Sequence, residues 1–220
     1  MPLWKVEFHC HTEFSRDSLT TIPHLLAAAR RRGIDRLVVT DHNTIAGARA
    51  AQAADPERII IGEEILTTQG ELLACFVTEE VPPLLKPAEA IARLKDQGAF
   101  ISVSHPFDLN RNGWQLPNLM AILPFVDAIE VFNARCFSAE INDQAAHFAV
   151  EHNLAGTVGS DAHAVFEIGR ATLTLPHFAS ADTLRAVLRS GIQQVRLSAP
   201  LVHFSSVYAR MVKRFRSRTA

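Results

Sequence analysis

Two histidines near the start of the chain could bind a metal ion. His9 and His11 are separated by Cys10, and they follow Val6 and Phe8, whose apolar side chains predict a short buried strand. On a strand, residues two positions apart point to the same side. The two imidazoles therefore point at one place, while Cys10 faces the other side. Neutral imidazoles that converge at the end of a strand favour a transition-metal site.

Similar residues follow most of the other predicted strands. Imidazole and carboxylate side chains occur where apolar runs stop and the chain becomes polar. The carboxyl ends of parallel strands meet on one face of an α/β barrel or sheet, so these groups are expected to converge. Five imidazoles and three carboxylates exceed the needs of one tetrahedral ion and favour two or three divalent ions, Mn²⁺, Zn²⁺ or Fe²⁺. The candidate ligands are His9, His11, Asp17, His42, Glu64, His105, Asp161 and His163.

Predicted strands and helices alternate along the chain. Two predicted helices, residues 23–32 and 87–97, begin with proline and end at a glycine, as helices commonly do. The alternation indicates parallel βαβ units, in a doubly wound sheet or a closed barrel. A single α/β barrel of seven parallel strands over residues 1–195 is favoured, because it gathers every strand end on one face. The predicted strands are residues 4–9, 36–40, 58–63, 71–77, 99–104, 127–132 and 155–159, and the remaining predicted helices are 44–54, 117–123, 140–152 and 181–189.

The charges are distributed unevenly along the 220 residues. The formal net charge is −1, but all 23 acidic residues lie at or before Asp182, and only basic residues follow it. The body of the protein is therefore acidic. Many inward-facing carboxylates favour bound cations, which would offset part of this charge. The basic residues after Asp182 are Arg185, Arg189, Arg196, Arg210, Lys213, Arg214, Arg216 and Arg218.

Residues 196–220 are predicted to form a basic amphipathic C-terminal extension. Apolar residues recur within it at a spacing of three or four, which is typical of one helix face. We expect this face to pack on the barrel and the basic tip to be solvated. Contact of the tail with nucleic acid or an anionic membrane is the less favoured alternative. The apolar positions are Leu201, Phe204, Tyr208, Met211 and Phe215.

The three cysteines favour reduced thiols in a cytoplasmic protein. Cys10 and Cys75 lie in predicted strands, Cys136 is distant from both in the sequence, and no C-x-x-C pair is present. A cysteine metal site is the alternative, and it lacks this spacing. No apolar run is long enough to span a bilayer, and we expect no signal peptide.

Six short motifs resemble those of the PHP (polymerase and histidinol phosphatase) family over residues 4–175. This resemblance implies a distorted seven-stranded (β/α) barrel of TIM-like type that holds a two- or three-metal phosphoesterase centre. It also implies that the eight candidate residues are the metal ligands, with Glu64 preferred to Glu63 because the family spacing is G-x-E. The motifs are His9–Thr12 (HCHT), Ser15–Ser18 (SRDS), Thr40–Asn43 (TDHN), Gly62–Glu64 (GEE), Ser104–Pro106 (SHP) and Gly159–His163 (GSDAH).

The chain departs from the family pattern at two positions. Many relatives carry a histidine at the start of the fourth strand, where this chain has Glu71. Glu71 is therefore either a further, oxygen-donating metal ligand or the sign of an altered metal position. Arg16 is an extra residue before Asp17, in a loop where many relatives read Ser-Asp-Gly, and it leaves the register of Asp17 open.

Arginines near two strand ends are candidate phosphate anchors. Arg111 lies in the loop after His105, Arg135 follows the sixth predicted strand, and Arg16 is a third candidate. A guanidinium group can meet two phosphate oxygens at once. The alternative is that each arginine forms ion pairs on the surface. Asp41 is expected to orient the site or to cap the following helix.

The predicted function is hydrolysis of a phosphoester of a small metabolite or nucleotide. In this hypothesis a metal-bound hydroxide attacks phosphorus, Asp161 or His163 moves the proton, and Arg111 and Arg135 hold the substrate. One alternative is hydrolysis of a C–N or carboxylic ester bond, because the same centre polarises carbonyl groups. The other is a metal-stabilised binding or regulatory domain without turnover.

Overall fold

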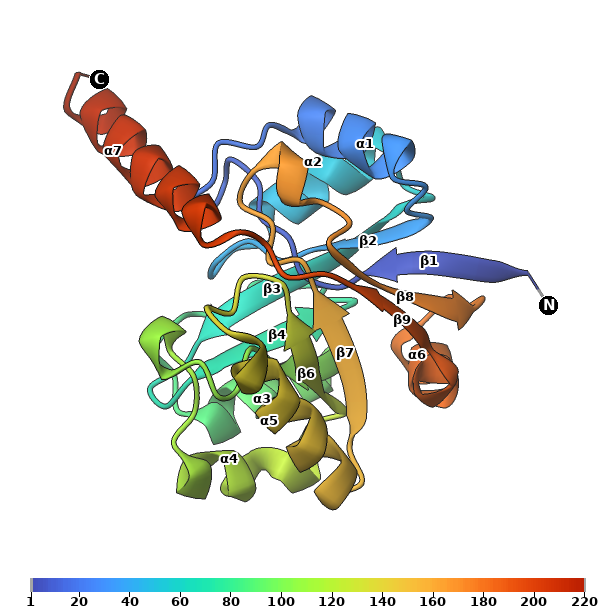
Figure 1. The fold of residues 1–220 in the computed structure, drawn as a ribbon. Helices are drawn as coiled ribbons and strands as arrows, with labels where there is room; N and C mark the ends of the chain where they lie inside the picture. Colours follow the sequence, from blue (N-terminus) through green and yellow to red (C-terminus); the bar gives the residue numbers. More distant parts are fainter. Residues whose placement is uncertain (1, 220) are drawn as a thin grey trace.

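The computed structural model describes residues 2–219, and side chains up to Arg216. Residues 1 and 220, the outer ends of the two predicted segments, lie outside the described part, as does the side chain of Arg218. The described chain forms a nine-stranded sheet surrounded by helices (Figure 1). The strands are β1 (Leu3–Glu7), β2 (Arg36–Val39), β3 (Ile59–Leu66), β4 (Glu71–Cys75), β5 (Phe100–Val103), β6 (Ala128–Asn133), β7 (Ala155–Gly159), β8 (Ala171–Pro176) and β9 (Ile192–Val195). The helices are α1 (Ile22–Arg31), α2 (Ala46–Ala54), α3 (Pro87–Asp96), α4 (Leu116–Ile122), α5 (Ala139–Glu151), α6 (Ala181–Val187) and α7 (His203–Thr219).

The sheet curves round until distant strands meet and it becomes a barrel. Its order is β7-β6-β5-β4-β3-β2-β1-β8-β9. Just beyond β1 and β7, the amide of Asp161 donates to the carbonyl of His9 at 2.8 Å, and the amide of His11 donates to the carbonyl of Ala162 at 2.9 Å. The barrel is therefore closed at the carboxyl ends of β1 and β7, where candidate ligands lie. This confirms an α/β barrel rather than an open sheet.

The predicted strands and helices are confirmed in position. Two corrections follow: the structure has two further strands, and one predicted strand runs in the opposite direction. Strands β1 to β7 and helices α1 to α6 lie where the sequence predicts them. Strands β8 and β9 were not predicted; β8 pairs antiparallel with β1, and β9 pairs antiparallel with β8. The alternation of threonine and leucine over Thr172–Leu175 is a strand signal that the prediction overlooked.

Strand β4 runs antiparallel to both of its neighbours, β3 and β5, so the seven predicted strands are not all parallel. The reason is the connection: only Thr67–Gly70 separates β3 from β4, whereas a parallel crossover needs about a dozen residues or more. The resulting hairpin pairs Glu71, the first residue of β4, with Leu66 near the end of β3. Glu71 therefore lies at the same end of the barrel as the candidate ligands.

Trp114 packs against this hairpin and fixes its position. Its side chain is buried, and its indole Nε1 donates to the carbonyl of Glu71 at 3.0 Å. The ring lies so close to Gly70 that a side chain there would collide with it. The sequence thus places its smallest residue where the largest one must pack.

Two helices show how local sequence sets their limits. Helices α1 and α3 each have a proline in the first turn, where its missing N–H costs no helical hydrogen bond. Gly33 and Gly98 follow them with φ values of +62° and +69°. Such left-handed conformations are the usual way to end a helix, and they favour glycine.

Helix α7 does not pack as the sequence predicts. We expected the five apolar positions of the C-terminal extension to face the barrel, but all of them are more than half exposed, including Leu201 in the 3₁₀ turn Pro200–Val202 before α7. The opposite face meets the body instead: Ala209 is buried, and Nζ of Lys213 donates to the carbonyl groups of Glu13 and Ser15. In Figure 1 the helix projects from the rest of the molecule. The exposed apolar positions are Leu201, Phe204, Tyr208, Met211 and Phe215.

Two further expectations can be compared with the structure. All three cysteines are buried and none forms a disulfide, as predicted for core thiols. Within residues 2–219, no helix combines the length and the apolar character needed to cross a bilayer.

The packing of Trp114 generates a prediction about stability. Replacing Trp114 with Ala should lower the free energy of unfolding by about 3–5 kcal/mol, because it leaves a cavity beside Gly70 and removes the bond to Glu71. Urea denaturation followed by circular dichroism measures this change. Val150→Ala on the exposed side of α5 is the control and should change the value by less than about 0.5 kcal/mol. An equal effect of both substitutions would contradict the role of the indole.

Candidate metal centre

All eight predicted ligands, and Glu71, lie together at one end of the barrel. They come from the carboxyl ends of the parallel strands, from the first residue of β4, and from the loop that precedes α1. All except His42 are buried. They line, or lie directly beneath, a cavity of about 560 Å³. The ligand-type side chains of the described part form three overlapping groups: His9, His11 and Asp161; His11, His42 and His163; and His42, Glu64 and Glu71.

In the first group His9 and His11 point at one place, although β1 ends at Glu7 and only Cys10 between them forms an isolated bridge, to Ala162. Their Nε2 atoms are 3.1 Å apart. Oδ1 of Asp161 lies 3.2 Å from Nε2 of His11 and 3.6 Å from Nε2 of His9. Three ligand atoms therefore surround a small space at the closed edge of the barrel.

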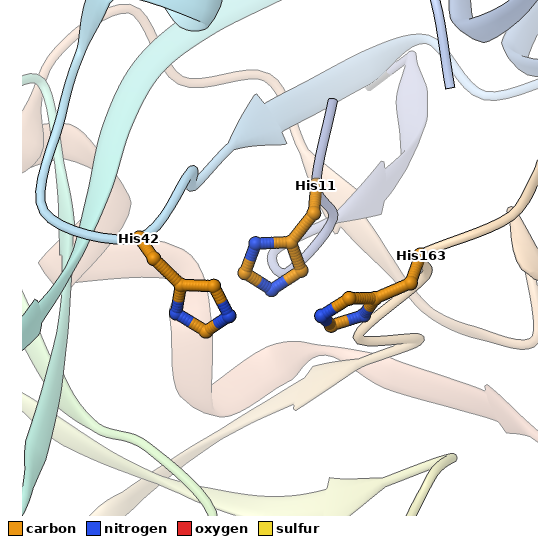
Figure 2. Close-up of side chains that lie close together, drawn as sticks. All are labelled: His11, His42 and His163. Carbon is orange, nitrogen blue, oxygen red and sulfur yellow. The ribbon is translucent and has the colours of Figure 1, made fainter. Parts of the chain in front are cut away.

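The second group brings together imidazoles from three separate segments. Figure 2 shows the rings of His11, His42 and His163 turned toward one another. Oδ1 of Asp17 lies 3.4 Å from Nε2 of His163 and 3.5 Å from Nε2 of His42. The extra residue Arg16 has therefore not displaced Asp17 from the cluster.

Glu64 lies at the centre of the third group and joins all three. Its Oε1 atom is 3.3 Å from Nε2 of His9 and 3.3 Å from Nε2 of His105. Its Oε2 atom is 2.9 Å from Nδ1 of His42. Nε2 of His105 is also 3.4 Å from Oε2 of Glu71. Both oxygens of one carboxylate thus face several imidazoles, which is the arrangement of a bridging ligand.

Strong charge coupling accompanies this crowding. Burial alone would lower the pKa of His42, but Glu64 and Asp17 raise it to about 9. Burial, together with the charge of Glu64, raises the pKa of Glu71 to about 7. In contrast, burial and the neighbouring imidazoles lower the pKa of His11 to about 3. The pKa values of adjacent groups thus shift in different directions, because burial removes water and leaves the neighbouring charges to decide which groups stay charged.

The residues fit divalent metal ions. Oε2 of Glu64 and Oδ1 of Asp17 are buried and accept no hydrogen bond from the described residues. Buried carboxylate oxygens without donors require cations nearby. A set of imidazole and carboxylate donors without thiolate suits Zn²⁺, Mn²⁺ or Fe²⁺. Cys10 lies apart from the three groups and donates to the carbonyl of Val38, so the structure does not support a cysteine ligand there.

A set of hydrogen bonds behind the ligands holds the rings in place. Nδ1 of His9 lies 3.0 Å from Oε1 of Glu130, and the amide of His105 donates to Oε2 of the same carboxylate at 2.9 Å. The hydroxyl of Ser15 donates to Asp41 at 2.5 Å, and Oγ of Ser15 lies 3.1 Å from Nδ1 of His11. Because Nδ1 of His9 and of His11 is held from behind, Nε2 of these two rings faces the centre.

Asp41 has the orienting role that we expected, and Glu130 is a residue that we missed. Glu130 is buried inside β6. The available signal was a carboxylate in the middle of an otherwise apolar strand. Buried carboxylates need partners, so this position pointed toward the centre.

The two predicted phosphate anchors have different surroundings. Arg111 lines the cavity, forms an ion pair with Asp161, and donates from Nε to Asp108 at 2.8 Å. Its side chain is 19% exposed, so one part of the guanidinium faces the cavity. These carboxylates raise the pKa of Arg111, which keeps it charged.

The alternative prediction, that Arg135 is a surface residue, is wrong. It is 3% exposed, and Nε lies 3.5 Å from Oε2 of the buried Glu167. Its guanidinium also donates to Oγ of Ser206 at 3.0 Å and thereby joins the barrel to α7. Glu167 was not predicted, because nothing in the sequence links it to Arg135.

Helix α7 contributes one wall of the cavity, which the sequence did not indicate. Its residues His203, Ser206 and Arg210 line the cavity. A terminal nitrogen of Arg210 lies 3.3 Å from Oδ2 of Asp17. The C-terminal extension therefore touches a candidate ligand directly.

Solved structures of other proteins share this fold. PsfC from Pseudomonas syringae matches with a TM-score of 0.69 and 18% identity, over 96% of this chain and all of that chain. A protein from Bifidobacterium adolescentis, described as a proposed metal-dependent phosphoesterase, matches with a TM-score of 0.64 and 20% identity, over 85% and 96% of the two chains. The lesion-specific endonuclease PfuEndoQ from Pyrococcus furiosus matches with a TM-score of 0.65 and 16% identity, over 90% of this chain and 60% of its own.

Sequence relatives extend the comparison. Two uncharacterised proteins of Methanocaldococcus jannaschii, MJ0417 and MJ1587, are 37% and 32% identical to this chain. The first match covers 76% of this chain and 68% of the relative, and the second covers 59% and 82%. A family model described as "PHP-associated" matches residues 139–192, and the model of the PHP domain matches residues 7–157. The second match alone spans more than half of the sequence, and this protein therefore belongs to the PHP domain family.

Proposed function

We propose that this protein is a metal-dependent phosphoesterase that hydrolyses a small phosphorylated metabolite or nucleotide. The observation that carries the proposal is Glu64, whose two oxygens face imidazoles of all three ligand groups at distances of 2.9–3.4 Å. Such sharing favours two or three ions rather than one. The fold of the Bifidobacterium protein, described as a proposed metal-dependent phosphoesterase, is consistent with this function.

Each group of side chains would hold one ion or share it with its neighbour. Asp17 and His105 would complete the second and third groups, since both lie within 3.5 Å of group members. Bound divalent ions would act as Lewis acids on the phosphoryl group and would lower the pKa of water. Glu71 occupies the position at which many family members have histidine. It belongs to the proposed ligand set because its Oε2 atom lies 3.4 Å from Nε2 of His105.

The cavity wall supplies positive charge for an anionic substrate. Arg16, Arg111 and Arg210 line the cavity beside the ligands. We assign phosphoryl oxygens to Arg111, whose ion pair with Asp161 orients it toward the centre. Arg135 also lines the cavity, and we assign it the support of this wall through Glu167 and Ser206. A cavity of about 560 Å³ is of the size that holds a small molecule.

Asp161 and His163 are the proposed proton carriers. Nδ1 of His163 lies 2.8 Å from the backbone carbonyl of Asp161, so its Nε2 faces the cavity. A nitrogen that binds an ion cannot also carry a proton. His163 would therefore move the proton only in a centre whose second ion is held by His11, His42 and Asp17, and Asp161 would move it through an oxygen that does not bind an ion.

We also propose residues 1–195 as the catalytic domain and residues 196–220 as an extension. The family matches end at residue 192, which supports a boundary near this position. The extension nevertheless forms one wall of the cavity through His203, Ser206 and Arg210.

The proposed chemistry can be tested with Mn²⁺-loaded protein and a panel of phosphorylated metabolites. We expect release of inorganic phosphate from at least one phosphoester, and no such release from Glu64→Gln protein, because the shared ligand is lost. Carboxylic esters and amides belong in the same panel, since an amidohydrolase from Chromobacterium violaceum shares this fold. Turnover of only those substrates would overturn the phosphoesterase proposal, and no turnover at all would favour a binding domain.

Removal of the ions should destabilise the protein. A ligand at a hundred times its dissociation constant stabilises the folded state by about 2.7 kcal/mol, so verified chelation should lower the melting temperature by roughly 5–10 °C. Elemental analysis before chelation should find two or three divalent ions per chain. Glu64→Gln should reduce both the number of bound ions and the loss of melting temperature on chelation. Glu89→Gln, which changes an exposed carboxylate on α3, should reduce neither. A single ion per fully loaded chain would contradict the shared centre.

Loss of Arg111 should impair catalysis but not metal binding. Arg111→Ala removes a charge-assisted contact worth on the order of 2–4 kcal/mol, which corresponds to a roughly 30- to 1000-fold lower kcat/KM on phosphoesters. The metal content should stay at the wild-type level. Arg93→Ala, a half-exposed arginine on α3, is the control. Wild-type kcat/KM in Arg111→Ala protein would remove this residue from substrate binding.

A further inference from the structure

The exposed apolar stripe of α7 lies on a helix that is otherwise anchored to the body. Phe204, Tyr208 and Met211 follow one another at helical spacing and are 69%, 60% and 51% exposed. The opposite face is held by Lys213 and by the bond between Arg135 and Ser206. Large apolar side chains in a row on a fixed helix form a surface that favours contact with another apolar surface.

A second apolar surface lies elsewhere on the same molecule. It is a groove of about 890 Å³ between α4 and α5, which we call the α4–α5 groove. Leu109, Leu116 and Met120 are 58%, 53% and 42% exposed along it, and Phe148 closes its floor. None of the metal-centre residues lines it. A groove between two helices that is lined by apolar side chains is the usual receptor for an amphipathic helix.

The charges of the two surfaces are complementary. The groove is rimmed by Glu140, Asp143 and Glu151, and no lysine or arginine is among the described residues that line it. Helix α7 has the opposite character, since only basic residues occur among the charged positions after Asp182. Complementary charges around apolar surfaces set orientation and select the partner.

The dimensions also agree. The stripe from Phe204 to Phe215 is about 16 Å long at 1.5 Å per residue, and the 13 residues of α5 give the groove a wall of about 20 Å. Figure 1 shows α7 projecting away from α4 and α5. Its first residue, His203, stacks on Phe137 just before α5, but no described residue of α7 lines its own groove.

We propose that α7 of one copy docks in the α4–α5 groove of a second copy, with the exchange made in both directions. Reciprocal docking uses the same two surfaces on each copy, so it closes into a two-fold dimer rather than an open chain. The aromatic and methionine side chains of the stripe enter the groove, and the acidic rim faces the basic helix. This inference does not depend on the proposed catalytic function.

The dimer can be tested by sedimentation velocity and light scattering on the full chain. We expect wild-type protein to be a dimer at micromolar concentration. Tyr208→Glu on the stripe and Met120→Glu in the groove should each weaken dimerisation at least about 100-fold, since each places a charge in both copies of the interface. Val150→Glu is the matched control, because Val150 is 82% exposed on α5 but does not line the groove. Circular dichroism and thermal melting confirm that each variant folds.

A mixing experiment separates this arrangement from others. Tyr208→Glu and Met120→Glu proteins are each monomeric in the proposal, but together they keep one intact helix and one intact groove. We expect the mixture to form heterodimers that neither variant forms alone. A wild-type monomer at all concentrations would overturn the proposal. So would a dimer that Met120→Glu leaves intact, which would indicate direct pairing of the helices. Binding of monomeric wild-type protein to vesicles of phosphatidylglycerol, lost in Tyr208→Glu, would assign the stripe to a membrane instead.

Discussion

The buried carboxylate of Glu64 is the constraint on which the rest of the site depends. A carboxylate that is 1% exposed is stable only where positive charge or donors surround it. Here the surrounding groups are imidazoles, joined by the hydroxyl of Ser104 at 2.8 Å. The imidazoles must therefore be aimed at one point from the ends of β1, β2 and β5, which requires these strands to converge at the barrel mouth.

The imidazoles are themselves constrained from behind. Glu130, the hydroxyl of Ser15 (itself held by Asp41) and a backbone carbonyl lie at Nδ1 of His9, His11 and His163, so these rings have little freedom to turn. Glu130 bonds to both His9 and the backbone of His105, and it thereby couples β1 to β5. The site is consequently a network in which positioning residues are as buried as the ligands, and a change in either layer alters the geometry of both.

Much of this arrangement could be predicted from the sequence, because it depends on local patterns. The spacing of His9 and His11, the polar residues after each apolar run, and the proline and glycine limits of α1 and α3 are all local. The direction of β4 was also readable, since the seven residues between the predicted strands 58–63 and 71–77 are too few for a crossover, but the prediction did not use the length of that connection. Glu130 was readable as a carboxylate within an apolar strand, but its partners, like the pairing of Glu167 with Arg135, are long-range contacts that one sequence does not reveal. The prediction of how α7 is oriented was wrong for another reason. Periodicity shows that a helix has an apolar and a polar face, but not which face contacts the body.

The closure of the barrel between Cys10 and Ala162 joins segments that are far apart along the chain. Contacts of such high sequence separation form late, because the loss of chain entropy on closing a long loop precedes the gain from the contact. His9 and His11 leave the ribosome early, whereas Asp161 and His163 follow after most of the barrel has been synthesised. An early fragment of the chain thus contains imidazoles without their partner carboxylate from β7. Completion of the sheet is the step that converts scattered ligands into a metal centre, so tight metal binding reports that the whole barrel has folded.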